Sequence, residues 1–274
     1  MTIPILLDCD PGHDDAIALL LALASPELEL LGVTTVHGNQ TLDKTTDNAL
    51  RVLELVGRTD VPVARGADRP LIREPHVAAH VHGESGLDGP ELPAATTEPV
   101  AQHAVEFIAE RIVLMGGAIA EGNMTPAAEF NIWADPEAAQ RVFHAGVPVT
   151  MIGLDVTHQA LLTPALAEQF RAAGRVGTFV AELVAFFKQY HARTYGWDGA
   201  PIHDAVALTQ AFRPDLVRTQ HLNVEVETES ELCRGRTVVD LWSRTDRPAN
   251  ADVGVEIDAD GFFELLLERI TTLS

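Results

Sequence analysis

Cysteines and basic residues are scarce in this sequence, and each shortage argues against a class of protein. Two cysteines in 274 residues, Cys9 and Cys233, do not make a disulfide framework. Nineteen lysines and arginines stand against 40 aspartates and glutamates, which gives a formal net charge of −21. A surface with that charge repels phosphate groups, so nucleic acids and anionic membranes are disfavoured as partners. A neutral small molecule would not be repelled.

Targeting and membrane-spanning segments are also missing. No basic segment precedes the first apolar run, as one does in a secretory signal peptide, and the apolar run 16–24 is too short to span a bilayer. No repeat, low-complexity tract or linker divides the chain. We therefore expect a cytoplasmic protein with one domain over residues 1–274. That length is enough for a large α/β domain with a substantial core.

Near its beginning the chain carries a dense group of acids. An apolar segment over 3–7 leads into Asp8, Asp10, Asp14 and Asp15, and an apolar helix-like run follows. Carboxylates this close repel unless a cation or hydrogen-bond donors balance them, and Ca²⁺ and Mg²⁺ prefer such oxygen ligands. Helix capping explains Asp14 and Asp15 but not the two acids that end the strand. The pattern predicts a metal site at a strand end, where ligands bind in open α/β sheets, and an enzyme.

Strands and helices alternate along the chain, which predicts an α/β fold with an open, mostly parallel, Rossmann-like sheet flanked by helices. A loop over 66–99 is rich in His, Gly and Pro, and loops this long are usually functional. The expected strands cover 3–7, 28–36, 61–63, 112–115, 149–154, 222–226 and 237–242. The expected helices cover 14–24, 41–56, 100–109, 136–145, 176–195 and 261–270, with another that opens at 203–204.

Several motifs resemble the nucleoside hydrolases, the inosine-uridine-preferring family that cleaves N-ribosides. The segment 8–16 reads D-x-D-P-G-x-D-D-A, as in the opening signature of that family. Further matches follow in the family's order: Val36-His37-Gly38-Asn39, His82-Gly83, Met115-Gly116-Gly117, Thr125 to Asn131, Asp135 to Ala138, and His203-Asp204-Ala205. The resemblance implies the family's fold, hydrolysis of ribonucleosides to ribose and free base, and a homodimer or homotetramer.

The same resemblance implies a Ca²⁺ ion held by Asp10, Asp15 and Asp204, with Asp8 in support. The residues themselves support this set through their charge and their places at strand–helix junctions. Taken alone, Asp204 could equally cap the helix that follows His203. Asp10, beside a cation, could take a proton from the water that attacks the ribose.

Cleavage of an N-glycosidic bond also needs a proton for the departing base. Either His203 or His82 could supply it, because histidine titrates near neutrality. The resemblance assigns the ribose hydroxyls to Asp14, Asn39, Asn123, Glu129 and Asn131, whose side chains make directional hydrogen bonds. Asn39 and Asn123 also fit ordinary turns. Phe186, Tyr190 and Tyr195 could line the base pocket, although their spacing equally predicts the buried face of a helix. The histidine before Asp204 resembles the branch that includes pyrimidine-preferring and broad-specificity members.

The chain departs from the family between Glu110 and Arg111. There the family carries a further strand and helix, one backbone carbonyl of which contributes to its metal site. A unit of roughly thirty residues is therefore absent. Loss of an interior strand would leave the edges of its neighbours unpaired. Either the strand is lost from the protein, or the sequence omits it, and the cost of unpaired edges favours omission.

Two other functions compete with hydrolysis of nucleosides. A non-catalytic nucleoside-binding protein on the same fold becomes the stronger alternative if the interior strand is lost. A metal-dependent phosphohydrolase would use a D-x-D nucleophile, which Asp8-Cys9-Asp10 matches only in its first half. No basic residue follows nearby to hold a phosphate, which weakens this third reading.

Overall fold

The computed structural model of the chain describes residues 2–104 and 111–273. Its first sheet is fully parallel and has the strand order β1-β2-β3. Helices α1 and α2 make the two crossovers between these strands, as parallel pairing requires. The elements are β1 Ile3–Cys9, α1 His13–Ala24, β2 Leu28–Thr35, α2 Leu42–Leu55 and β3 Val63–Arg65.

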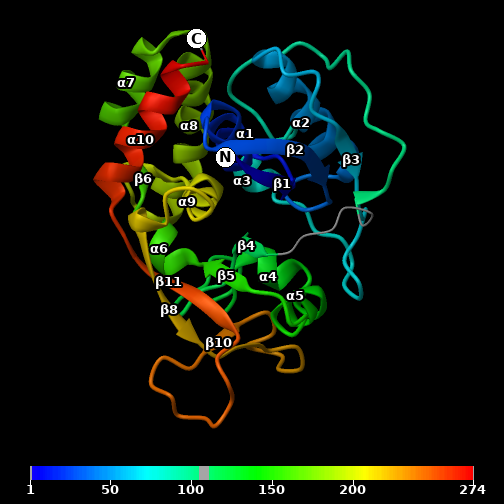
Figure 1. Cartoon of the computed structure of the whole chain (residues 1–274), viewed down its shortest axis with the longest axis vertical. Coiled ribbons are helices and arrows are strands. Elements are labelled where there is room, and N and C mark those ends of the chain that lie inside the picture. Colours follow the sequence, from blue (N-terminus) through cyan, green and yellow to red (C-terminus); the bar gives the residue numbers. More distant parts are fainter. Residues whose placement is uncertain (1, 105–110, 274) are drawn as a thin grey trace.

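A second sheet has the order β4-β5-β11-β8, in which β8 is the single antiparallel strand at one edge. Figure 1 shows the two sheets in separate parts of the molecule, with β1–β3 at the upper right and the second sheet below. Two short antiparallel pairs, β9 with β10 and β6 with β7, complete the described strands. The bounds are β4 Ile112–Met115, β5 Val149–Ile152, β6 Leu161–Leu162, β7 Ala200–Pro201, β8 Val217–Leu222, β9 Val224–Val226, β10 Thr237–Val239 and β11 Ala251–Ile257.

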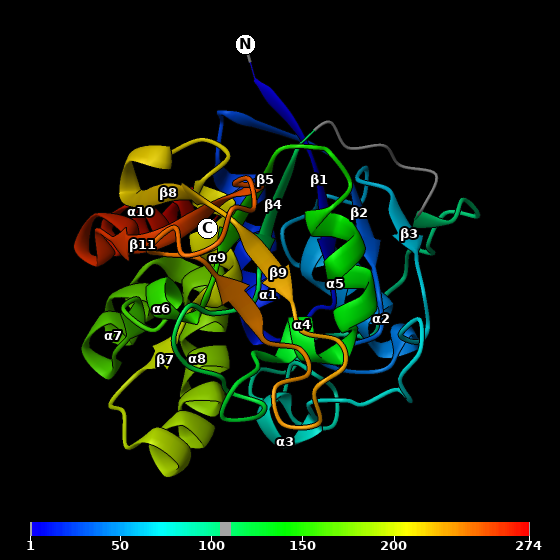
Figure 2. The same cartoon turned by 90° about the horizontal axis from the view of Figure 1, so that it is seen from below.

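Helix α1 lies among four of the other helices. Helix α1 is apolar on nearly every side, all of its residues except Leu23 are buried, and it packs against α2, α8, α9 and α10. Helices α7, α8 and α10 gather on one side of the molecule and α2 lies on the other (Figures 1 and 2). The bounds are α3 Ala79–His82, α4 Phe130–Ala134, α5 Pro136–Phe143, α6 Leu154–Thr157, α7 Pro164–Ala172, α8 Gly174–Tyr195, α9 His203–Thr209 and α10 Ala259–Thr271, with a 3₁₀ helix at Pro214–Leu216.

The α/β class and the mostly parallel arrangement predicted from the sequence are confirmed, but the described strands form two sheets instead of one. One edge of β1 pairs with β2 and one edge of β4 pairs with β5. The opposite edge of each has no strand partner within 2–104 and 111–273. All four apolar residues of β4 are only half-buried, whereas all four residues of β5 are buried.

Three expectations from the sequence need correction or fall outside the described residues. The helix predicted over 100–109 does not begin at Val100, which instead makes a parallel bridge to Ala64 and donates its N–H to the Val63 carbonyl at 2.8 Å. Residues 105–110, and with them the predicted junction between Glu110 and Arg111, lie outside the described residues. Strands β11 and β8 and helix α7 were not predicted.

In the described part of the chain, no helix has both the length and the apolar character needed to cross a bilayer. Both cysteines are free, and Cys9 is buried.

Candidate active site

A cavity lies where β1 and β4 end and helices α1 and α9 begin. Its wall includes every predicted site residue except Asp15. These residues come from distant parts of the chain, and the fold brings them together because the carboxyl ends of parallel strands share one edge. The predicted residues in the wall are Asp10, Asp14, Asn39, His82, Asn123, Glu129, Asn131, His203 and Asp204.

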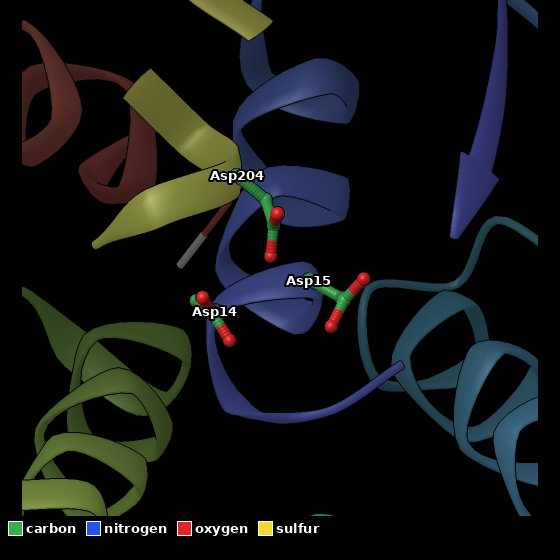
Figure 3. Close-up of side chains that lie close together, drawn as sticks. All are labelled: Asp14, Asp15 and Asp204. Atoms are coloured by element: carbon green, nitrogen blue, oxygen red, sulfur yellow. The ribbon is translucent and has the colours of Figure 1, made fainter. Parts of the chain in front are cut away.

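Three carboxylates form a compact cluster beside this cavity. Asp14 and Asp15 occupy the first turn of α1, and Asp204 occupies the first turn of α9, which packs against α1. One oxygen from each lies within 4.8 Å of the others, and Figure 3 shows Asp204 facing the first turn of α1. The cluster shares Asp15 and Asp204 with the predicted metal set, and Asp14 stands in it beside them.

Asp10, the remaining predicted ligand, lines the cavity from the end of β1. Its Oδ2 accepts the backbone N–H of Asn39 at 2.5 Å. A Cβ on Gly38 would lie 2.0 Å from that oxygen, so only glycine lets the loop after β2 approach so closely. The turn after β2 therefore fixes the Asp10 carboxylate by a backbone contact.

Asp15 is held by three donors. Its Oδ2 accepts the Gly12 N–H and the Asn39 side-chain amide, both at 2.9 Å, and its Oδ1 accepts the Asp10 N–H at 3.3 Å. Gly12 is the N-cap of α1, so Asp15 caps its own helix. This is the capping role that the sequence offered as an alternative to metal binding. The same bonds also orient it within the acid cluster.

The cluster concentrates negative charge in a buried place. Burial raises the pKa of the Asp10 carboxyl well above its usual range, and the neighbouring Asp15 charge adds to this rise. Burial and Asp15 together raise the pKa of Asp14 to about 7. Burial, followed by the Asp14 charge, also raises the pKa of Asp204 well above its usual range. No lysine or arginine is among the described residues that line the cavity. A donor set of oxygens with unbalanced charge fits a hard divalent cation.

His82 reaches the cavity from α3 and is fixed by His13. The His13 Nε2 lies 2.8 Å from the Asp88 carbonyl oxygen, where it can only donate. Burial lowers the pKa of His13 to about 4, so its Nδ1 carries no proton at neutral pH. That nitrogen lies 3.0 Å from the His82 Nδ1, which also accepts the His13 backbone N–H at 3.3 Å. Both contacts orient the His82 ring and turn its Nε2 away from His13.

His203 is held in a different way. It opens α9, and its Nδ1 lies 2.7 Å from the hydroxyl of Thr157 in α6. Burial lowers the pKa of His203 well below its usual range, so the ring is neutral. The Thr157 hydroxyl can donate to Nδ1 or accept from it, so this contact orients the ring and is compatible with both tautomers. The bond holds Nδ1 against α6 and leaves Nε2 on the opposite side of the ring.

The predicted ribose ligands also have structural partners. Asn123 accepts the Phe130 N–H at 2.8 Å, and the Asn131 amide lies 3.3 Å from the Met115 carbonyl. Glu129 is the N-cap of α4, where it accepts backbone N–H groups from Gly117 at 2.9 Å and Asn131 at 2.8 Å. These bonds explain the geometry of the loop after β4 and leave further oxygen and amide groups at the cavity wall.

The cavity wall contains two of the three aromatic residues considered from the sequence, and histidines that were not predicted. Tyr190 and Tyr195 line the cavity from α8, whereas Phe186 stacks on His13 and is not in the wall. Three unpredicted histidines, His80, His158 and His191, also line the cavity. His158 follows β5 at its carboxyl end, and this position could have revealed it. The position of His191 in a helix gave no such indication.

Comparison with known proteins places these features in context. The sequence model of the family described as inosine-uridine preferring nucleoside hydrolase matches residues 5–112 and 109–264. The chain is 48% identical over 311 aligned positions to the pyrimidine-specific ribonucleoside hydrolase RihA of Enterobacter sp. (strain 638), and the match covers 100% of this chain and 99% of that protein. It is 50% identical over 307 positions to the protein of the same name from Shewanella sp. (strain ANA-3), covering 98% and 96%.

A solved structure is similar over nearly the whole chain. It is titled as a purine-preferring ribonucleoside hydrolase from Gardnerella vaginalis. The TM-score is 0.92 at 32% identity, and the match covers 99% of each chain. The backbone fold of this chain is therefore shared with a protein named for purines, whereas its two sequence relatives are named for pyrimidines.

Proposed function

Because this chain belongs to the inosine-uridine preferring nucleoside hydrolase family, we propose that it is a Ca²⁺-dependent hydrolase that splits pyrimidine ribonucleosides into ribose and free base. The observation that carries the proposal is the meeting of buried carboxylates and the histidines His82 and His203 at one cavity. The pyrimidine preference rests on the names of two relatives that are 48% and 50% identical. A neutral nucleoside can approach this acidic protein without repulsion.

Asp10, Asp15 and Asp204, with Asp14 beside them, are the residues that would hold the cation. When bound, the cation supplies positive charge that keeps these buried carboxylates ionised and lowers the pKa of water. Several oxygens in a site of mixed side chains suit Ca²⁺, which accepts more ligands and looser geometry than Mg²⁺.

The chain's own residues carry the two proton transfers. Asp10 accepts a proton from the water that attacks C1′ of the ribose. The C1′–N bond breaks with its electron pair going to the base. His203 in its imidazolium form, which the negative charge developing on the base favours, donates a proton to the departing base, becomes neutral and is reprotonated from solvent. Charge on the ribose in the transition state is positive, so the surrounding carboxylates favour it. His82, which lines the same cavity, is the alternative source of that proton.

A hydrolysis assay tests the proposal. Uridine, cytidine and inosine are each incubated with the protein, with EDTA, and with EDTA followed by excess Ca²⁺ or Mg²⁺. We expect uridine and cytidine to be hydrolysed faster than inosine, EDTA to abolish turnover, and Ca²⁺ to restore it better than Mg²⁺. Undiminished turnover in EDTA would contradict the role of the cation. Nucleoside binding without hydrolysis in Ca²⁺ would favour the non-catalytic alternative.

No observation favours the phosphohydrolase reading, because none of the described residues lining the cavity carries the basic side chain that phosphate recognition uses. The homodimer or homotetramer implied by the family stays part of the proposal. Sedimentation velocity at several protein concentrations would measure it directly.

A further inference from the structure

We propose that Trp133 of α4 is a positioning residue for nucleoside binding: it holds the segment 66–78 against α4 and thereby fixes two parts of the cavity wall relative to each other. This inference rests on the proposed function, because the wall is where the nucleoside would bind. Trp133 itself is half-buried and does not line the cavity.

The segment 66–78 has little structure of its own. It contains no helix or strand, and none of the residues 66–77 is buried. Among the hydrogen bonds of the described residues, a single one joins 68–77 to the rest of the chain, from the Leu71 N–H to the Asp135 Oδ2 at 2.7 Å. Ordering an irregular segment costs conformational entropy at every residue, so further contacts are needed to fix it.

Trp133 supplies these contacts. The guanidinium carbon of Arg73 lies 4.4 Å from the centre of the Trp133 ring, which is a cation–π distance. The His76 ring meets the same indole in a T-shaped arrangement, with 5.4 Å between the ring centres and 84° between the planes. Two side chains of one irregular segment therefore rest on one aromatic ring.

The backbone of Trp133 is fixed from two directions. Its N–H donates to the Glu129 carbonyl at 2.8 Å within α4. The connection between β9 and β10 runs beside α4 (Figure 2), and a Cβ on Gly235 in that connection would lie 2.7 Å from the Trp133 Cα. Gly235 also has a φ of +87°, so this close approach depends on glycine. Trp133 thus offers the segment 66–78 a fixed surface.

These contacts join two parts of the cavity wall. The segment 66–78 ends at Ala78 and continues into α3, and both Ala78 and His82 line the cavity. On the α4 side, Phe130 lines the cavity and its ring centre lies 6.4 Å from that of Trp133. Removal of the indole should therefore loosen the wall that contacts the nucleoside, while the acid cluster on α1 and α9 keeps its own contacts.

Steady-state kinetics with uridine is the first test. We expect Trp133→Ala to raise KM about tenfold and to leave kcat within about twofold, as when binding of substrate and transition state is weakened equally. Trp133→Phe keeps an aromatic face and should recover most of the loss. Trp242→Ala, at a residue that is 79% exposed, is the control. A fall in kcat at unchanged KM, or equal losses in the Ala and Phe variants, would overturn the proposal.

Arg73→Gln tests the same contact from the other side and changes no core residue. We expect KM to rise roughly 2- to 5-fold, in keeping with an exposed cation–π contact. The double variant with Trp133→Ala should be no worse than Trp133→Ala alone, because both changes remove one interaction. Arg69→Gln, on the same segment at a side chain that is 70% exposed, is the matched control. Additive effects of the Arg73 and Trp133 changes would overturn the proposal.

Hydrogen exchange separates a failure of this proposal from a failure of the proposed function. The N–H groups of Val81, His82 and Gly83 bond to the carbonyls at the start of α3. We expect all three to exchange faster in Trp133→Ala and in Arg73→Gln, but not in the Arg69 control. This measurement needs no nucleoside, so it decides the role of Trp133 even if the protein hydrolyses no uridine. Unchanged exchange in both variants would show that α3 is positioned without Trp133 and would overturn the proposal.

Discussion

Asp10 is the residue on which the proposed reaction depends most directly. We expect Asp10→Asn to lower kcat by about 100-fold or more, because the amide keeps the shape of the side chain but cannot accept the proton of water. Nucleoside binding should be partly retained, since the amide oxygen can still accept the Asn39 N–H. Steady-state kinetics with uridine and a binding titration check both statements. Asp198→Asn, which changes a carboxylate that is 86% exposed, is the control and should change neither. Near-normal turnover in the Asp10 variant would assign water activation to another group.

We expect the loss of kcat/KM on removal of the His203 side chain to be larger for leaving groups that need a proton than for those that do not. For uridine, His203→Ala should lower kcat/KM by roughly 10² to 10⁴, the usual contribution of a general acid. For p-nitrophenyl riboside the loss should be much smaller, because nitrophenolate leaves without a proton. His144→Ala, at a side chain that is 52% exposed, is the control. Equal losses on both substrates would assign His203 to positioning.

Individual residues differ in how far their roles could be predicted. The acids and histidines at strand ends were identifiable because polar groups there have little structural reason to follow a buried strand. His191 was not, since it lies four residues after Phe187 on a helix whose apolar spacing predicts a core face. The grouping of Asp14 with Asp15 and Asp204 depends on the packing of α1 against α9, which the sequence does not express.

At the scale of elements, two neighbouring helices have acidic caps with different surroundings. Glu129 caps α4 and lines the cavity, while Asp135 caps α5, accepts the Ala138 N–H at 3.0 Å and lies outside the wall. We expect Glu129→Ala and Asp135→Ala each to lower the free energy of unfolding by about 2 kcal/mol, because backbone donors lose a charged acceptor. Only Glu129→Ala should also reduce turnover. Urea unfolding and uridine kinetics measure the two effects. Full activity in the Glu129 variant would make that residue a cap alone.

Among the elements, long periodic segments and the apolar strands β4 and β5 were predicted within a few residues, whereas several other short elements were missed. The helix expected over 176–195 occupies Gly174–Tyr195, because its apolar spacing persists over many turns. Strand β11 was missed although it lies between β5 and β8, since glycine and aspartate interrupt its apolar residues. The residues at 100 and beyond were predicted to be helical from composition, yet Val100 pairs with the edge of β3. In both places the structure is set by pairing with a neighbouring strand and not by the local sequence.

The whole molecule should lose stability with rising pH when cations are removed. The folded pKa of Asp14 is about 7, and those of Asp10 and Asp204 are also raised well above the usual 3.8. A raised folded pKa means that the folded state keeps protons which the unfolded chain has released. This contribution is complete below about pH 4 and is lost as pH rises through the folded pKa. The buried histidines have lowered pKa values and oppose this trend only below about pH 6.5.

Thermal unfolding in EDTA at about pH 7 and about pH 8.5 therefore isolates the carboxylates. We expect a lower midpoint at the higher pH, a smaller difference in Asp204→Asn, and recovery of the midpoint on addition of Ca²⁺, which binds only the folded arrangement. A midpoint in EDTA that does not fall between these two pH values would show that the carboxylates are already balanced within the protein.

The wide separation of the acid cluster along the sequence also affects how the protein folds during synthesis. Asp14 and Asp15 leave the ribosome about 190 residues before Asp204. Helix α1 has most of its packing partners, α8, α9 and α10, in the later part of the chain. Domains fold as units, and contacts between such distant segments form slowly. A nascent chain stalled before residue 203 should therefore expose the apolar surface of α1 and depend on chaperones, and neither cation binding nor a protected core can be established until synthesis is nearly complete.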